Sequence, residues 1–239
     1  LLPKSSLGTF ISGNKYGCLQ RLHSWNTMPS DERSLWHVYE DINRKTQNSD
    51  LVAKIIDESK VYYKMLSYSE KKMKGVLTRG IVRESIKAAC IFVACKNNGV
   101  PRSSSEIAKM FGIQTTDVTK GLKKFIEIEM KKNLHINVSV TDSQDFIKRY
   151  CCKLNISRIY EKIALIISER SRKMGIVNDN TPPSIAAGII YLIIIIYKLK
   201  ITKTMLRDKL SVSDVTICKC YKKLWKYRKQ LFIGIKKTF

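Results

Sequence analysis

The stretch SIKAA at residues 85–89 recurs 99 residues later as SIAAG at residues 184–188. Further along the chain, TDVT at residues 116–119 recurs as SDVT at residues 213–216, at a spacing of 97 residues. Two weak matches in the same order, at nearly the same spacing, are stronger evidence than either match alone. They predict one supersecondary unit of about a hundred residues that the chain uses twice.

The first copy is predicted to be a five-helix unit around a helix over about residues 80–97, which is apolar nearly all round as a central helix must be. Two helices precede this central helix: the first begins at Ser30, and the second spans about residues 49–66. A short helix follows from Ser103 to Gly112, and a longer one spans about residues 115–132. The inward face expected for the first helix consists of Leu35, Trp36, Tyr39 and Ile42.

The second copy repeats this plan. Its first helix is expected to begin at Thr141, and its second to span about residues 156–174. The third runs from Thr181 to about residue 198, a short fourth begins at Thr202, and the fifth runs from Ser213 to about Arg228. No stretch of useful length alternates between apolar and polar residues, which is the pattern of a strand, so no sheet is expected. The predicted fold is therefore all-α, with tandem five-helix domains at residues 30–137 and 138–239. Residues 1–29 precede them as an extended linker with room for one short helix.

The formal net charge of +24 points to a polyanionic partner. Residues 138–239 carry 21 basic and 7 acidic groups, so the excess lies within a predicted domain and not only on a tail. Nucleic acid is the commonest such partner, because lysines and arginines that neutralise phosphates release bound counterions. The plainer alternative is a lysine-rich, solvated surface. We favour nucleic acid because of where the charge lies.

Several other classes of protein find no support in the sequence. The seven cysteines include no C-x-x-C pair, so no zinc ribbon or finger is predicted. The most apolar stretch, residues 185–197, is 13 residues long and too short to span a bilayer. The three histidines are isolated, and neither a phosphate-binding glycine loop nor a nucleophile elbow occurs. We therefore expect neither an enzyme nor a membrane protein.

The chain resembles the transcription factor IIB (TFIIB) family over nearly its whole length. AACIFVAC at residues 88–95 with GVPR at 99–102 resembles the central helix and following turn of the family's first cyclin-like repeat. PSIAA at 183–187 with VSDVTI at 212–217 resembles the second repeat, and SLGT at 6–9 resembles the linker that precedes the repeats. SWN at residues 24–26 is more similar to the versions carried by large DNA viruses.

This resemblance implies a general transcription initiation factor. Such a factor holds double-stranded promoter DNA and the TATA-binding protein with its repeats and places them on RNA polymerase, and its linker crosses the polymerase cleft. The family's zinc ribbon would lie upstream of Leu1, so no metal or cofactor is expected in this chain. A monomer is expected, in the nucleus for a cellular source or in the cytoplasmic virus factory for a viral one.

The last helix pair, residues 202–210 and 213–228, has the pattern of a helix-turn-helix, whose second helix lies in the major groove. At 3.6 residues per turn, Ile217, Tyr221 and Leu224 should pack inward. By the resemblance, this helix touches DNA upstream of the TATA box. Cys218 stands where family members carry an arginine, so phosphate contacts, a base contact by Val215 and an altered sequence preference are expected. The predicted DNA-binding residues of this helix are Val215, Thr216, Lys219, Lys222 and Lys226. The alternative is an amphipathic helix with a solvated lysine face.

Two positions in the first repeat are further candidates for DNA contact. Lys120 lies on the corresponding helix, together with Lys123 and Lys124. Arg79 and Gly80 resemble the family's loop that touches DNA downstream of the TATA box, although Ile81 stands where an arginine is often found. The alternative for this loop is a helix-entry glycine beside a surface arginine.

Two other functions share this fold and stay open at this stage. A cyclin, the activating subunit of a protein kinase, has the same pair of domains, and fold alone does not decide function. An RNA polymerase III-type relative of TFIIB is the other. A cyclin would not require the charge of the second repeat, and the polymerase III relative has a long carboxy-terminal extension.

Overall fold

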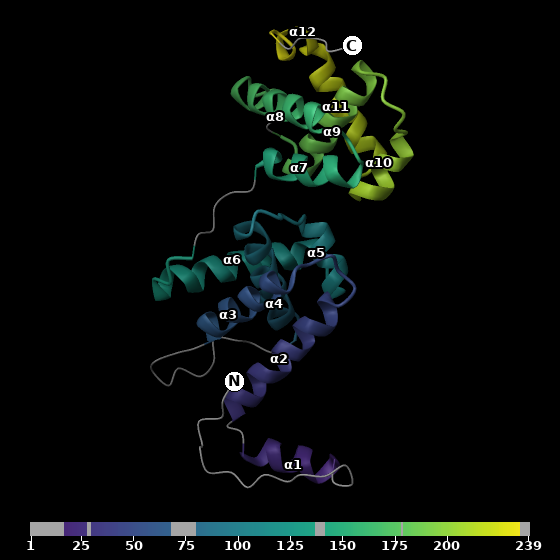
Figure 1. The fold of residues 1–239 in the computed structure, drawn as a ribbon. Coiled ribbons are helices and arrows are strands. Elements are labelled where there is room, and N and C mark those ends of the chain that lie inside the picture. The colour runs from purple at the N-terminus through teal and green to yellow at the C-terminus, as the bar shows by residue number, and fades with distance from the viewer. Residues whose placement is uncertain (1–16, 28–29, 68–79, 137–141, 178, 235–239) are drawn as a thin grey trace. The chain divides into compact units, whose positions relative to one another are not determined.

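A computed structural model describes residues 17–27, 30–67, 80–136, 142–177 and 179–234 of the chain. Figure 1 shows these parts as helices joined by short connections. No strand occurs among these residues, and the all-α prediction is confirmed. The helices are α1 (Gly17–Thr27), α2 (Ser30–Thr46), α3 (Ala53–Ser67), α4 (Ile81–Asn97), α5 (Ser104–Phe111), α6 (Thr115–Lys132), α7 (Ser143–Lys153), α8 (Arg158–Lys173), α9 (Pro182–Ile196), α10 (Lys203–Leu210), α11 (Asp214–Lys226) and α12 (Arg228–Leu231).

The chain divides into two compact units, and we describe each by itself. The first comprises residues 1–94 and 108–135, and the second comprises residues 95–107 and 136–239. Helices α2 to α6 are called the first repeat below, and α7 to α11 the second repeat. The helix α1 lies in the predicted linker, of which residues 1–16 and 28–29 are outside the described residues.

The central helix of the first repeat is α4, and its side chains are buried on nearly all sides, from Ser85 to Ile91 and again from Val93 to Cys95. This agrees with its nearly uninterrupted apolar sequence. In α2 the buried row is Val38, Ile42 and Thr46, which are spaced four residues apart. The expectation that Trp36 lies inward is wrong: it is 42% exposed, because it lies well away from that row around the helix.

A lysine of α4 is also buried, and charged partners from α2 and α4 surround it. The side chain of Lys87 is only 4% exposed; it pairs with Asp41 of α2 and with Glu84 at 2.5 Å. Lys45 pairs with the same two carboxylates. Burial alone would raise the pKa of Asp41, but the hydrogen bond and charge of Lys87 help to hold it below its usual value. The four charges thus join α2 to the central helix.

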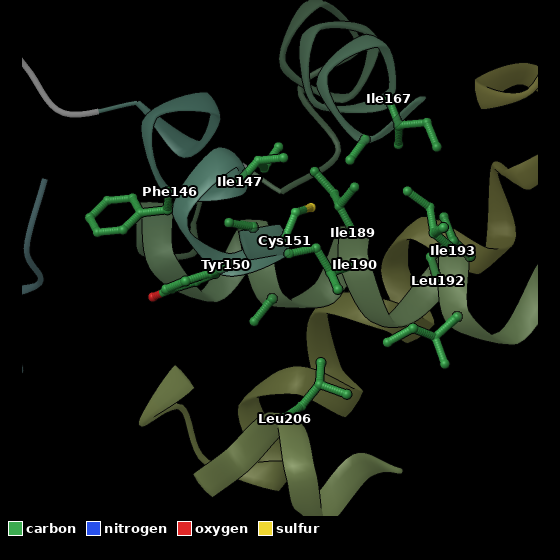
Figure 2. Packing of buried hydrophobic residues seen from close by; sticks show 14 of the residues in the cluster. Phe146, Ile147, Tyr150, Cys151, Ile167, Ile189, Ile190, Leu192, Ile193 and Leu206 are labelled. Carbon is green, nitrogen blue, oxygen red and sulfur yellow. The ribbon is translucent and has the colours of Figure 1, made fainter. Parts of the chain in front are cut away.

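The core of the second repeat forms around α9, which α7, α8, α10 and α11 all contact. Figure 2 shows Ile189, Ile190 and Ile193 of α9 meeting Ile147 and Cys151 of α7 and Ile167 of α8. Buried positions follow one another around α9 instead of keeping to one face, as the sequence predicted for a central helix. The described residues contain no helix long and apolar enough to cross a membrane.

The helices α4 to α6 of the first repeat correspond to α9 to α11 of the second repeat at a single spacing of 99 residues. The helix α5 corresponds end to end with α10, and the residues that follow them, Gly112 and Ser211, both have positive φ angles, 65° and 56°. At this spacing Val118 corresponds to Ile217, and both are fully buried. The spacing of 97 residues is therefore wrong for the fifth helices, because it would pair buried Val118 with exposed Val215.

The short helix α12 lies beyond the five predicted helices of the second repeat. Leu231 is fully buried in the core of that repeat, and the ring of Phe232 lies 6.4 Å from that of Tyr197. From α8, Arg170 donates hydrogen bonds of 2.7 Å to the carbonyl oxygens of Leu231 and Ile233. The segment from α12 to Ile233 therefore packs as part of the second unit.

Candidate nucleic-acid interface

The helices α10 and α11 form a helix-turn-helix whose ends are fixed by local hydrogen bonds. The hydroxyl of Thr202 accepts from the backbone N–H of Met205 at the start of α10. Ser211 adopts the left-handed conformation that ends this helix, and the hydroxyl of Ser213 accepts from the N–H of Thr216 at the start of α11. Hydroxyl caps of this kind satisfy backbone donors that the helix leaves unpaired. The residues from Thr202 to Ser213 thus fix where α10 begins and ends and where α11 begins.

The inner face of α11 holds the helix against α9. Ile217, Cys220 and Leu224 are fully buried. Tyr221, expected to lie inward with Ile217 and Leu224, is half-buried and lies at the edge of this face. Its ring makes an edge contact with Tyr191 of α9 at 5.1 Å. The buried Cys220, absent from the sequence-based prediction, lies directly against Gly188 of α9.

The opposite face of α11 brings together four of the predicted DNA-binding residues. Lys219, Lys222 and Lys226 are exposed on it, and Val215 in the first turn is 63% exposed. None of these three lysines pairs with a carboxylate within the part of the chain that the structure describes. The result is a row of three uncompensated positive charges with one exposed apolar side chain at its amino-terminal end, which we call the α11 basic face.

Thr216, the fifth predicted residue of this helix, lies to one side of the α11 basic face. It is half-buried, and its hydroxyl makes a 2.7 Å hydrogen bond with that of Ser213. This bond belongs to the cap of α11. A DNA contact by Thr216 stays a prediction.

Other charged groups near α11 have partners. The guanidinium of Arg207 on α10 lies 3.0 Å from the carboxylate of Asp208 and 3.6 Å from that of Asp214. A hydrogen bond to Cys218 raises the pKa of Lys203, at the start of α10. Lys223 lies 3.4 Å from Asp179. These charged neighbours were not among the sequence-predicted residues.

The first repeat has a weaker version of this face on α6. Lys120, Lys123 and Lys124 are exposed there, and the register of 99 residues pairs them with Lys219, Lys222 and Lys223. Lys120 has a carboxylate neighbour, Asp117, at 3.4 Å. The α6 face is therefore closer to neutral than the α11 basic face.

The downstream loop candidates are only partly described. Arg79 lies outside the described residues. Gly80 is exposed with a φ of +68°, and a Cβ added there would meet no atom within 4 Å. Its conformation therefore explains the glycine without any ligand, because other residues rarely adopt it. Ile81, the next residue, is 65% exposed. A DNA contact by Arg79 and Gly80 stays a prediction.

No cluster of His, Cys, Asp and Glu side chains that could hold a metal ion occurs among the described residues. The described cysteines, among them the buried Cys90 and Cys95 of α4, are all free thiols. The candidate interface thus consists of lysine and apolar side chains on a helix.

Comparisons with known proteins agree with this architecture. A family model described as the transcription factor TFIIB repeat matches residues 32–128 and 136–227. A putative transcription initiation factor IIB-like protein of Acanthamoeba polyphaga mimivirus is 39% identical over 236 residues, covering 94% of this chain and 51% of that protein. Transcription initiation factor IIB of Dictyostelium discoideum is 28% identical, covering 97% and 69%. The factor of the same name from Xenopus laevis is 27% identical, covering 86% and 62%.

The chain thus spans about half to two-thirds of the length of these relatives. A chain of the CAK complex from Chaetomium thermophilum bound to ATP-gamma-S matches 88% of this chain and 68% of its own length at 18% identity. Its TM-score of 0.33 is too low to show a common overall fold.

Proposed function

Because the chain belongs to the TFIIB family, we propose that it acts as a general transcription initiation factor. In this role it binds double-stranded promoter DNA together with the TATA-binding protein and positions RNA polymerase for initiation. The observation that carries the proposal is the α11 basic face, whose three lysines have no carboxylate partner among the described residues.

The chemistry of that face suits a duplex. In a helix-turn-helix the second helix enters the major groove, so the outward lysines of α11 would lie near the phosphates that border it. A lysine without a partner loses no ion pair when it meets a phosphate, and the counterions it displaces favour binding. Arg207, by contrast, would have to leave Asp208 and Asp214. Lys219, Lys222 and Lys226 are therefore the expected phosphate contacts.

The first repeat contributes a second, weaker contact through Lys120, while Arg79 and Gly80 form the proposed downstream contact. We propose no enzymatic activity, in line with the family's role as a transcription factor. The chain would work with the transcription machinery, in the nucleus of a cellular source or in the virus factory of a viral one.

An electrophoretic shift assay with a TATA-containing promoter duplex tests this proposal. We expect the chain to add to a complex of the duplex and the TATA-binding protein, and to do so less well when Lys219 and Lys222 are both replaced by alanine. The matched control removes two exposed lysines of α7 and α8, Lys148 and Lys162. A chain that binds neither the duplex nor its complex with the TATA-binding protein contradicts the proposal and favours a cyclin-type kinase subunit.

A further inference from the structure

The end of α11 and the start of α12 form a positively charged surface with an exposed aromatic side chain. Residues 215–234 carry five lysines and one arginine and no acidic residue. Lys226, the last lysine of the α11 basic face, is followed by Tyr227, Arg228 and Lys229. Tyr227 is 44% exposed, and the exposed Lys229 has no carboxylate partner among the described residues. We call these last three residues the α12 aromatic patch.

The backbone fixes the position of Tyr227 at the junction of the two helices. Its N–H donates to the carbonyl oxygen of Leu224 at 3.1 Å, and its own carbonyl oxygen accepts from the N–H of Leu231 at 3.0 Å. Leu224 and Leu231 are both fully buried. The ring is therefore displayed on a fixed support, and tyrosine has only two χ angles to immobilise when it binds a ligand.

Tyr227 differs from the other aromatic side chains nearby because those already have partners. The ring of Trp225 lies 5.5 Å from that of Tyr221, and the guanidinium of Arg228 lies over it at 4.5 Å. Arg228 also donates a hydrogen bond of 3.1 Å to the carbonyl oxygen of Trp225, which holds its charge close to the junction. Within the described parts of the chain, Tyr227 makes no ring contact of this kind.

An open ring between cations matches a polyanion that also offers flat apolar faces. Single-stranded nucleic acid has both features, because its phosphates carry the charge and its unpaired bases stack on aromatic side chains. In a duplex the bases stack on one another, and only their edges line the grooves. An acidic peptide would supply charge without a base to stack.

We propose that the α12 aromatic patch binds single-stranded nucleic acid. One unpaired base stacks on Tyr227, and the adjoining phosphates meet Arg228 and Lys229. The site goes beyond the proposed function, which concerns a duplex held by the α11 basic face, and does not depend on it.

Fluorescence anisotropy with the full chain and labelled strands of about 12 nucleotides tests the inference, since single-strand sites cover about 4–16 nucleotides. Oligothymidylate is compared with a strand of the same length and charge that lacks the bases. We expect oligothymidylate to bind at least about fivefold more tightly, which is the effect of one stacked base. Oligouridylate in a parallel arm shows whether DNA or RNA is the preferred source of the unpaired base.

Tyr227→Ala should weaken oligothymidylate binding at least about fivefold, to near the affinity for the base-free strand. Tyr227→Phe keeps the ring and should keep the affinity. Lys229→Ala should make the slope of log K against log salt concentration less steep by about 0.7, the contribution of one phosphate contact on a single strand. The matched control is Trp36→Ala, which removes an aromatic side chain that is 42% exposed on α2 and should change nothing.

Equal affinity of the wild type for the two strands overturns the inference, as does a Tyr227→Ala variant that keeps the preference for bases. Tyr227→Ala should still join the promoter duplex and the TATA-binding protein as the wild type does. If it weakens duplex and single-strand binding equally, the ring does not select unpaired bases and the inference fails. A chain that shows the expected preference for bases but binds no duplex would support this inference and contradict the proposed function.

Discussion

Gly188 of α9 and Cys220 of α11 lie so close that a Cβ built on Gly188 would sit 2.6 Å from the Cβ of Cys220. The first repeat has a corresponding close contact, in which a Cβ on Gly121 of α6 would lie 2.1 Å from the carbonyl oxygen of Ser85 on α4. At the spacing of 99 residues Gly121 corresponds to Cys220. In each repeat one glycine therefore allows the fifth helix to pack closely against the central helix. The glycine is on the fifth helix in the first repeat and on the central helix in the second.

Replacing Gly188 with alanine is expected to destabilise the second unit by about 1–3 kcal/mol, because the added methyl overpacks a rigid contact between two helices. Chemical denaturation of the chain measures this change. The control is Gly17→Ala in α1, where an added Cβ meets no atom within 4 Å.

The double variant Gly188→Ala/Cys220→Gly sharpens that prediction. At the spacing of 99 residues Gly188 corresponds to Ala89 and Cys220 to Gly121, so the double variant places in the second repeat the residues that the first repeat has at these two positions. It should lose less stability than the sum of the two single changes, with a coupling of about 0.5–3 kcal/mol. Strict additivity would mean that the two residues do not constrain each other.

Asp41→Asn is expected to destabilise the first unit and to do so in a pH-dependent way. The pKa of Asp41 is lowered in the folded chain, so its charge stabilises the fold above the unfolded value of about 3.9 and less so as pH falls through the folded value. Loss of one partner from a buried ion pair costs about 3–5 kcal/mol, and Glu84, which still pairs with Lys87, keeps the cost towards the lower end.

Unfolding free energies of the wild type and Asp41→Asn, measured from pH 7 to pH 3, check this. The difference between them should shrink below about pH 4. A difference that stays constant over the whole range would show that the carboxylate's charge contributes nothing.

Leu231→Ala is expected to cost about 2–5 kcal/mol, because Leu231 of α12 is fully buried and the change leaves a cavity. Ile233→Ala, two residues along, is the control: Ile233 is 66% exposed, and its loss should change the unfolding free energy by about 0.5 kcal/mol at most. Equal effects of the two changes would mean that α12 does not pack in solution as the structure describes.

The sequence predicted the fold well where one physical signal dominates. The unbroken apolar run before Tyr197 could only be a central helix, and hydroxyl residues such as Thr202 and Ser213 marked helix starts that the structure confirms. The lysine face of α11 followed from helical periodicity alone.

Other features depended on contacts between distant parts of the chain. The short match between residues 116–119 and 213–216 suggested a spacing of 97 residues, two fewer than the spacing of 99 in the structure. Burial decides which residues of the two repeats correspond, and a match of four residues does not reveal burial. Trp36 was expected inward from its apolar character, but the row through Val38 and Ile42 takes that place. Arg170, which binds the backbone of α12, gives no sequence signal at all.

The most direct test of the account is the salt dependence of duplex binding by the Lys219→Ala/Lys222→Ala variant. If both lysines contact phosphates, the slope of log K against log salt concentration should become less steep by about two, because each contact contributes about one. The Lys148→Ala/Lys162→Ala chain, which carries the same net charge, should keep the wild-type slope. An unchanged affinity and slope in the α11 variant would contradict the claim that this helix holds DNA.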